Sequence, residues 1–234
     1  MLETLFSVVP CESQIHLFGL VHLTFLVSSI ILAFFMIKYK KESVFLEKLS
    51  TLIVLGMHLI LYGWYYFSSE SFIIKALPLY TCRMVLYLYI GGIFFKNKFC
   101  LKLATYWGFF GGIAGLLLPT IFKYPFPHIL QITTLMLHVY IFLLSTNYLF
   151  VKKIGMDKED TKMCSICTVG FLMFTTVFNM IFGSNYTSTF KMPAHLINFG
   201  FKVPTGLCFT VVTVGYLIAI FIQHIVVEKY TKNN

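Results

Sequence analysis

Seven long apolar runs, separated by short polar stretches, limit what this chain can fold into more than any other feature of its sequence. A helix needs about 20 predominantly apolar residues to cross the hydrocarbon core of a bilayer, and each run is close to that length. We therefore expect an all-α integral membrane protein: a seven-transmembrane-helix bundle that forms one domain over residues 1–234. The runs cover Ile15–Ile37, Leu49–Phe67, Leu77–Phe95, Leu101–Phe122, Ile129–Val151, Met163–Phe182 and Leu207–Val227.

The composition agrees with a membrane location. Only 12% of the residues are charged and 58% are hydrophobic, whereas about 25% of the residues in a soluble domain are charged. A soluble enzyme, a disordered chain, a collagen-like fibre and a disulfide-rich secreted module are excluded. The net charge of +9 is typical of basic loops on the cytoplasmic side of a membrane, so we expect no nucleic-acid partner.

The lysines alternate between loops. Most of them flank the first, third and fifth loops and the C-terminal tail, and few flank the other loops. The positive-inside rule then places the N-terminus outside and the C-terminus in the cytoplasm. The lysines on the predicted cytoplasmic side are Lys38, Lys40, Lys41, Lys48, Lys96, Lys98, Lys102, Lys152, Lys153, Lys158, Lys162, Lys229 and Lys232.

Acidic side chains fall outside every predicted span. Ion-coupled transporters usually carry intramembrane carboxylates, so this pattern argues against that class. Apart from Lys102 at the edge of the fourth run, Arg83 is then the one formal charge inside a span. An intramembrane charge indicates a functional site or a tight polar pair, although Arg83 near a helix end could also extend to the headgroups.

Cys82 is the strongest candidate nucleophile. It follows Leu77-Pro78-Leu79-Tyr80-Thr81 and precedes Arg83. Pro78 suits the first turn of a helix, which places Cys82 about one turn inside the span from the outer side. A helix N-terminus and a neighbouring guanidinium both favour the thiolate. The alternative interpretation is that Cys82 is a buried small hydrophobe.

Several polar side chains are predicted at a similar depth. They are His22 in the first span, His138 in the fifth, Asn179 in the sixth, and Asn185 and Tyr186 in the turn after it. Intramembrane histidines and asparagines usually face a partner or a wet cavity. Cysteine, histidine base and orienting amide together are typical of acyl transfer. Either His22 or His138 could be the base.

Three further features have structural interpretations. His58 lies at mid-depth of the second span, where an interhelical hydrogen bond is favoured over catalysis. The fourth span carries Gly108 and Gly112, and Gly111 and Gly115, as two G-x-x-x-G pairs, which allow a neighbouring helix to approach closely. The rigid turn from Tyr124 to His128 either lines the site or anchors the chain at the interface.

The order of these motifs resembles the small bacterial YwaF-like membrane proteins and their relatives around transmembrane protein 164. The resemblance implies a seven-helix fold. For the transmembrane protein 164 relatives it implies phospholipid acyl transfer through a cysteine acyl-enzyme, with Cys82 as nucleophile and His138 as candidate base. The motifs that carry it are Leu77-Pro78-Leu79 with Cys82, Tyr106-Trp107-Gly108 with Pro119, Phe126-Pro127-His128, His138, Asn179 and Gly183-Ser184-Asn185-Tyr186.

Two functions follow as hypotheses. The first is a lipid-to-lipid acyltransferase in which Arg83 binds phosphate and Asn179 or Asn185 stabilises the oxyanion. Its partners would be membrane phospholipids and lysophospholipids, and we expect no cofactor and no metal. The second is a non-enzymatic carrier or binding protein for a lipid or small solute; a receptor or purely structural role ranks third. The Lys, Ile, Phe and Asn bias suggests an AT-rich genome and hence a bacterial cell membrane.

Overall fold

The computed structural model describes residues 2–11, 16–68, 71–120, 122–192, 197 and 202–232, and within them all regular secondary structure is helical. Three short non-α turns complete the helices: the π-helical turn η1 (Asn147–Val151) and the 3₁₀ turns η2 (Tyr186–Ser188) and η3 (Thr205–Leu207). The helices are α1 (Leu2–Leu5), α2 (Leu20–Tyr39), α3 (Val44–Phe67), α4 (Phe72–Lys75), α5 (Thr81–Ile93), α6 (Lys98–Leu117), α7 (Ile129–Thr146), α8 (Lys158–Phe182) and α10 (Cys208–Lys232).

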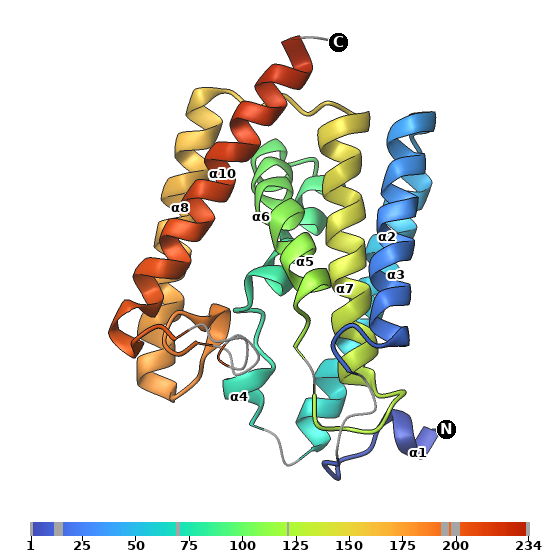
Figure 1. Cartoon of the computed structure of the whole chain (residues 1–234), viewed down its shortest axis with the longest axis vertical. Helices are drawn as coiled ribbons and strands as arrows, with labels where there is room; N and C mark the ends of the chain where they lie inside the picture. Colours follow the sequence, from blue (N-terminus) through green and yellow to red (C-terminus); the bar gives the residue numbers. More distant parts are fainter. Residues whose placement is uncertain are drawn as a thin grey trace.

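Six of the described helices are long and apolar enough to cross a bilayer: α2, α3, α6, α7 with η1, α8 and α10. Helix α5 is equally apolar in character but has only 13 residues, which is shorter than an ordinary span. The chain enters the bundle at one end and leaves it at the other, as the N and C labels in Figure 1 show.

Polar caps extend several helices beyond their apolar runs. Ser43 accepts a hydrogen bond from the backbone N–H of Leu46 and starts α3. Asn97 does the same for α6 through the N–H of Cys100. Asp157 starts α8 with a reciprocal capping box. These side chains satisfy backbone donors that a helix start leaves open, so the helices begin three to five residues before the predicted spans.

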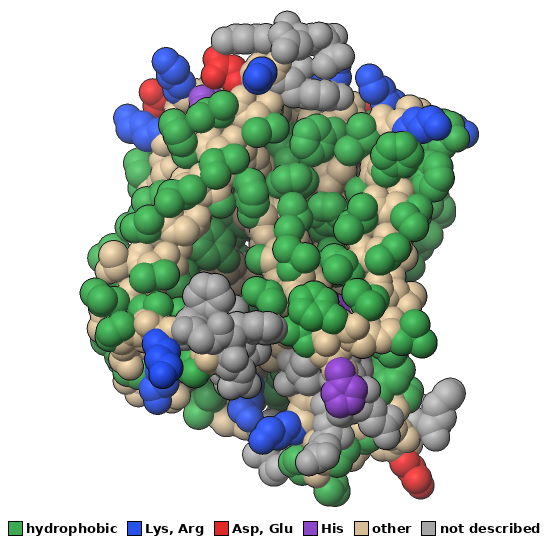
Figure 2. All heavy atoms as spheres, viewed as in Figure 1, with side chains coloured by type: hydrophobic (Ala, Val, Ile, Leu, Met, Phe, Trp, Pro, Cys, Tyr) green, Lys and Arg blue, Asp and Glu red, His purple; other side chains and the backbone are tan. Residues whose placement is uncertain are grey.

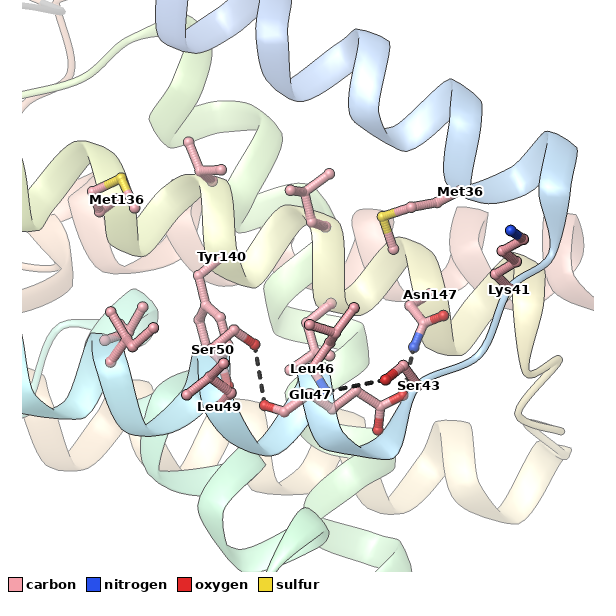
Figure 3. A pocket seen from close by; sticks show the side chains of 15 residues that line it. Met36, Lys41, Ser43, Leu46, Glu47, Leu49, Ser50, Met136, Tyr140 and Asn147 are labelled. Carbon is pink, nitrogen blue, oxygen red and sulfur yellow. Dashed lines mark hydrogen bonds between the residues drawn. The ribbon is translucent and has the colours of Figure 1, made fainter.

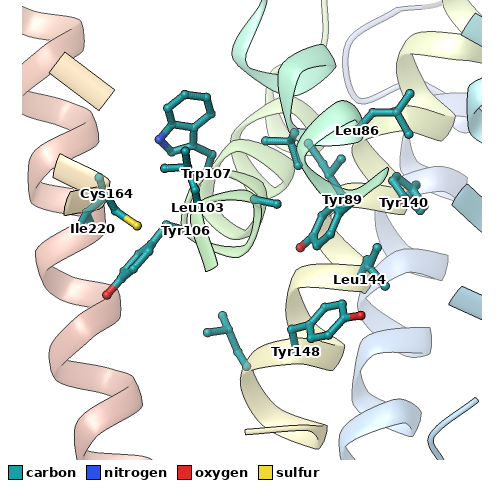
Figure 4. Packing of buried hydrophobic residues seen from close by; sticks show 14 of the residues in the cluster. Leu86, Tyr89, Leu103, Tyr106, Trp107, Tyr140, Leu144, Tyr148, Cys164 and Ile220 are labelled. Atoms are coloured by element: carbon teal, nitrogen blue, oxygen red, sulfur yellow. The ribbon is translucent and has the colours of Figure 1, made fainter. Parts of the chain in front are cut away.

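The helices form three groups (Figure 1). Helices α8 and α10 pack together on one side, α5 and α6 lie in the middle, and α7 with α2 and α3 forms the other side. Helix α7 is the most deeply buried of the six long helices. The core between the groups is rich in aromatic side chains, and Figure 4 shows Tyr89, Tyr106, Trp107, Tyr140 and Tyr148 within it.

Glycines let α6 approach α7 closely. A Cβ atom at Gly112 would lie 2.7 Å from Cβ of Phe142, and one at Gly108 would overlap the hydroxyl of Ser145. Gly115 makes room for the ring of His138. At Gly111, in contrast, an added Cβ would meet no atom within 4 Å. The predicted close approach is therefore confirmed at three of the four glycines and is absent at Gly111.

A continuous apolar surface covers the middle of the bundle. Figure 2 shows hydrophobic side chains over the body of the molecule, with lysines and acidic residues gathered at its two ends. Large apolar side chains on α2, α3, α8 and α10 are 40% or more exposed, Leu32, Leu52, Met173 and Phe221 among them. Such a surface is stable against lipid rather than water, and the chain is an integral membrane protein.

One acidic residue departs from the expectation that every carboxylate lies outside the spans. Glu47 lies in the first turn of α3 and is only 6% exposed. Its carboxylate accepts hydrogen bonds from Asn147 Nδ2, Tyr148 Oη and Lys152 Nζ. The expectation was wrong because it began the second span at Leu49, whereas the Ser43 cap begins the helix at Val44.

Candidate functional site

One cavity brings together the start of α5 with the middle of α3 and the first half of α7. It has a volume of about 360 Å³, which lies within the usual range for small-molecule sites. Cys82 and Arg83 come from α5, and His138 comes from α7. We call this space the Cys82 cavity. Its lining also includes His58, Tyr65, Lys75, Tyr80, Thr120, Phe122 and Tyr124.

Cys82 is half-buried and not in a disulfide. It is the second residue of α5, whose N-cap is Tyr80. The first backbone N–H groups of a helix have no acceptor within it, and those of Cys82 and Arg83 donate toward the thiol. No hydrogen bond joins Cys82 Sγ to His138; the two side chains face the same cavity from different helices.

His138 is held in one tautomer. Its Nδ1 lies 2.8 Å from the backbone carbonyl of Thr134. A carbonyl oxygen only accepts, so Nδ1 carries the proton of the neutral ring and Nε2 carries the lone pair. Gly115 of α6 leaves the space in which the ring lies. The geometry therefore provides a buried imidazole whose Nε2 is able to take a proton.

His58 has the same arrangement on α3. Its Nδ1 lies 3.0 Å from the carbonyl of Val54, one turn earlier in the helix. The predicted interhelical hydrogen bond is therefore absent among the described residues, and the bond that forms lies within α3. His58 lines the Cys82 cavity together with His138. The cavity thus contains two histidines with Nε2 as the basic nitrogen.

Arg83 is buried without a carboxylate partner among the residues that the structure describes. Its Nη1 donates to the backbone carbonyls of Lys75 and Ala76 at 2.8 Å and of Leu77 at 3.3 Å. The guanidinium also lies 5.0 Å from the ring centroid of Tyr80, a favourable cation–π contact. Its Nε and Nη2 donate to none of the described residues, so the positive charge remains available to the cavity.

The turn from Tyr124 to His128 forms one wall. Phe122 and Tyr124 line the cavity. The ring of His128 stacks on Tyr124 with a centroid distance of 4.4 Å, and Gln131 Nε2 donates to the carbonyls of Phe122 and Tyr124. Of this turn, Tyr124 lines the cavity, and the role of the turn in a site stays a prediction.

Asn179 and Tyr186 support the segment that carries Cys82 without lining the cavity. Asn179 donates to the carbonyl of Tyr186 and accepts from its N–H. The hydroxyl of Tyr186 donates to the carbonyl of Ile73 and accepts from the N–H of Leu77. Residues 73–77 are therefore held by Tyr186 on one side and by Arg83 on the other.

His22 and Asn185 lie elsewhere. Nε2 of His22 donates to the carbonyl of Leu116 at 2.6 Å and joins α2 to α6, and Nδ1 accepts from the N–H of Phe18 just before α2. Both ring nitrogens are therefore already used. Asn185 folds its own loop by accepting from the N–H groups of Phe190 and Lys191. Neither residue lines the Cys82 cavity.

The model of the TMEM164 family matches residues 13–223 of this sequence. The chain belongs to the TMEM164 family. No curated protein and no solved structure matches it. The transmembrane protein 164 part of the predicted resemblance is confirmed, and the YwaF-like name stays a prediction.

For this TMEM164-family chain, three of the seven predicted site residues share one cavity: Cys82, Arg83 and His138. Sequence reasoning missed His58 as a cavity residue and Lys75 as a second cation in its lining. The signal for His58 was its intramembrane position, which by itself fits either a structural or a functional role. Lys75 gave no signal, because its approach to the cavity depends on the fold of residues 73–80.

Proposed function

We propose that this TMEM164-family protein is a membrane phospholipid acyltransferase that moves an acyl chain from one lipid to another through a thioester on Cys82. The observation that carries the proposal is the convergence of a thiol, an imidazole with a basic Nε2 and an unpaired guanidinium on one cavity. Cysteine with a nearby histidine base is a recognised arrangement for acyl transfer.

The proposal includes the topology. We infer that α5 is a seventh, shortened pass, with residues 76–80 completing it, and that the N-terminus lies outside and the C-terminus in the cytoplasm. The opposite positions of the two termini support an odd number of passes (Figure 1). The lysine distribution supports the orientation, and it would place the Cys82 cavity in the outer half of a bacterial cell membrane.

In the acylation half-reaction, His138 Nε2 takes the thiol proton and Cys82 Sγ attacks the ester carbonyl of a phospholipid. The carbon–oxygen ester bond breaks. The departing lysophospholipid oxygen takes the proton from His138, and the acyl chain remains on sulfur as a thioester. The step requires Sγ and Nε2 to come together when substrate binds, and catalytic hydrogen bonds are often long before that.

The second half-reaction reverses these steps with a different lysophospholipid. Its hydroxyl gives a proton to His138, its oxygen attacks the thioester carbonyl, and the carbon–sulfur bond breaks. The thiolate then recovers the proton. Because an ester is exchanged for an ester, no nucleotide and no oxidant are needed.

Two groups are suited to the charges that develop. The N–H groups at the start of α5 replace Asn179 and Asn185 as candidates for stabilising the oxyanion, because both asparagines are committed to their own loop. Preorganised donors of this kind are often the largest single contribution to acyl transfer. Arg83 is suited to the phosphate, through the guanidinium nitrogens Nε and Nη2, which donate to none of the described residues.

The decisive experiment uses purified protein with labelled phospholipid and unlabelled lysophospholipid. Cys82→Ala is expected to lower transfer at least about a thousandfold, and intact mass spectrometry of the wild type is expected to show an acyl adduct that Cys82→Ala lacks. Cys100→Ala is the matched control, since Cys100 is a half-buried thiol on α6 outside the cavity. Undiminished transfer by Cys82→Ala would contradict the covalent scheme.

The missing hydrogen bond between Cys82 and His138 favours a second candidate, a carrier or binding protein for an anionic lipid or solute. In that function Arg83 and Lys75 would hold the anion. Binding or uptake that persists in Cys82→Ala and is lost in Arg83→Gln, with no acyl adduct on the wild type, would identify it.

A further inference from the structure

A second hollow lies on the other half of the same helices. It has a volume of about 470 Å³ and is enclosed by α2, α3 and α7, and we call it the α2/α3/α7 groove. Its lining on α3 runs from Ser43 to Val54, and its lining on α7 runs from Met136 to Leu144, followed by Asn147. None of these residues lines the Cys82 cavity. The groove is therefore a separate candidate binding site.

The groove is polar at one end and apolar along the rest of its length. Figure 3 shows Lys41, Ser43 and Asn147 together at one end and Met136 at the other. Between them the walls are aliphatic, with Leu46, Ile53, Val139 and Leu143 among the lining residues. A site with this polarity fits an amphiphile that has one polar head and one extended apolar chain.

The polar end carries a net positive charge. Glu47 lines it, but its carboxylate is paired with Lys152 at 2.6 Å and contributes no net charge. Lys41 also lines it and forms no ion pair with any residue that the structure describes. Lys38 and Lys40 are exposed at the same end of α2. Charge complementarity therefore favours an anionic headgroup, to which each nearby lysine adds attraction.

Glu47 and Asn147, which line the polar end of the groove with Lys41, are joined by a hydrogen bond. The π-helical turn η1 begins at Asn147 and brings Asn147, Tyr148 and Lys152 onto the carboxylate of Glu47. Single π-helical turns occur frequently at functional sites. A buried carboxylate in a spanning helix is also costly unless it serves a purpose. Both features lie at the polar end of the groove, which Glu47 and Asn147 line.

We propose that the α2/α3/α7 groove binds one anionic phospholipid from the leaflet on the lysine-rich side of the protein. Its phosphate lies beside Lys41, and one acyl chain runs along Leu46, Val139 and Leu143 toward Met136. This site is independent of acyl transfer and of Cys82, so it stands whether or not the proposed enzyme activity does.

The test of the headgroup uses the full-length protein in phosphatidylcholine nanodiscs that contain a minor fraction of phosphatidylglycerol. Native mass spectrometry then counts the lipids that remain bound. Lys41→Gln is expected to lower retention of phosphatidylglycerol about fivefold. Lys48→Gln, an exposed lysine on α3 outside the groove lining, is expected to leave it unchanged. Equal retention of phosphatidylcholine and phosphatidylglycerol by the wild type would overturn the proposal.

The test of the chain uses phosphatidylglycerol with a photoreactive acyl group. We expect peptide mapping to find cross-links on Val139 and Leu143 in the wild type and in Cys82→Ala alike. Leu143→Trp fills the groove and is expected to remove the tightly retained lipid, whereas Leu52→Trp, on the exposed face of α3, is the matched control. Cross-links spread evenly over the outer faces of α3 and α10 would show that the lipid is only part of the surrounding bilayer, and would overturn the proposal. This readout comes from the wild type, so it holds even if Leu143→Trp fails to fold.

Discussion

The ring of His138 occupies the space that Gly115 leaves by having no side chain. A Cβ atom at position 115 would lie 2.6 Å from Cγ of His138 and closer still to Cδ2 and Nε2. The position of the candidate base therefore depends on a glycine of a different helix, α6.

Gly115→Ala should displace the imidazole of His138 and lower acyl transfer at least about tenfold. Overpacking of this kind typically costs about 1–3 kcal/mol of stability, and the melting temperature in detergent should fall accordingly. Gly111→Ala is the control, since a side chain there meets no atom within 4 Å and alanine favours the helix by up to about 1 kcal/mol. Equal activity of the two variants would show that the His138 ring is not needed in its present place.

Tyr186→Phe should loosen the segment that leads into α5. The change removes the hydroxyl that joins the carbonyl of Ile73 to the N–H of Leu77. Leaving buried polar groups without partners costs about 1–3 kcal/mol, measurable by thermal unfolding in micelles. Transfer should fall as well, because Cys82 and Arg83 both lie in the first turn of α5, directly after the loosened segment.

The control for this change is Tyr66→Phe, since Tyr66 is 75% exposed on the outer face of α3. It should alter neither stability nor transfer. If Tyr186→Phe behaves like Tyr66→Phe, the hydroxyl of Tyr186 does not hold the segment.

Glu47→Gln should destabilise the lysine-rich half of the bundle. It leaves Lys152 without its counter-charge in a largely buried setting. Breaking a fully buried pair costs about 3–5 kcal/mol; we expect about 1–3 kcal/mol here, because the Lys152 side chain is 19% exposed. The double change Glu47→Gln with Lys152→Met should recover part of the loss.

An exposed pair provides the comparison. Glu159 and Lys162 lie 3.9 Å apart with side chains that are 80% and 67% exposed, and such pairs contribute about 0–1 kcal/mol. Glu159→Gln should therefore change the melting temperature little. A loss for Glu47→Gln no larger than this one would mean that the buried pair is not structural.

Stability should also decrease in acid through the N-cap of α8. The backbone N–H of Asp160 donates to the Asp157 carboxylate at 2.7 Å, and this bond, with the nearby charge of Lys102, lowers the pKa of Asp157 below its ordinary value. A lowered pKa means that the stabilisation is complete above about pH 4 and is lost as the pH falls further. Melting temperatures of wild type and Asp157→Asn should thus converge below about pH 4, since asparagine caps without titrating. A difference in melting temperature that stays constant as the pH falls would argue against a titrating cap at Asp157.

Six of the seven predicted spans coincide with long helices of the described residues, because an apolar run of about 20 residues has few alternatives to a span. The third run, Leu77–Phe95, contains only the 13-residue helix α5. The first residues of α3, α6 and α8 could not be predicted from apolar runs. These helices start in polar stretches, where a capping side chain decides the boundary: Ser43, Asn97 and Asp157. The same effect placed Glu47 inside α3.

The candidate site was only partly predictable, for a related reason. Depth along a helix follows from counting residues, so Cys82 and His138 could be placed at one level. The direction in which a side chain faces depends on helix packing. His22 was expected beside them. It is instead the third residue of α2, and its ring is hydrogen-bonded to the carbonyl of Leu116 on α6. Asn179 instead stabilises a loop, a role that its position in the sequence did not indicate.

Arg83 carries its hydrogen-bond acceptors with it along the chain. The three carbonyls that receive its Nη1 protons belong to residues only six to eight positions earlier. Inserting a bare arginine into a bilayer costs about 2.5–3.5 kcal/mol on insertion scales, and a distant partner would lower that cost only after the bundle had assembled. In this protein the carbonyls and the guanidinium belong to one nine-residue segment, residues 75–83, and are synthesised together. The charge that the proposed chemistry needs can therefore enter the membrane before its neighbouring helices have been synthesised.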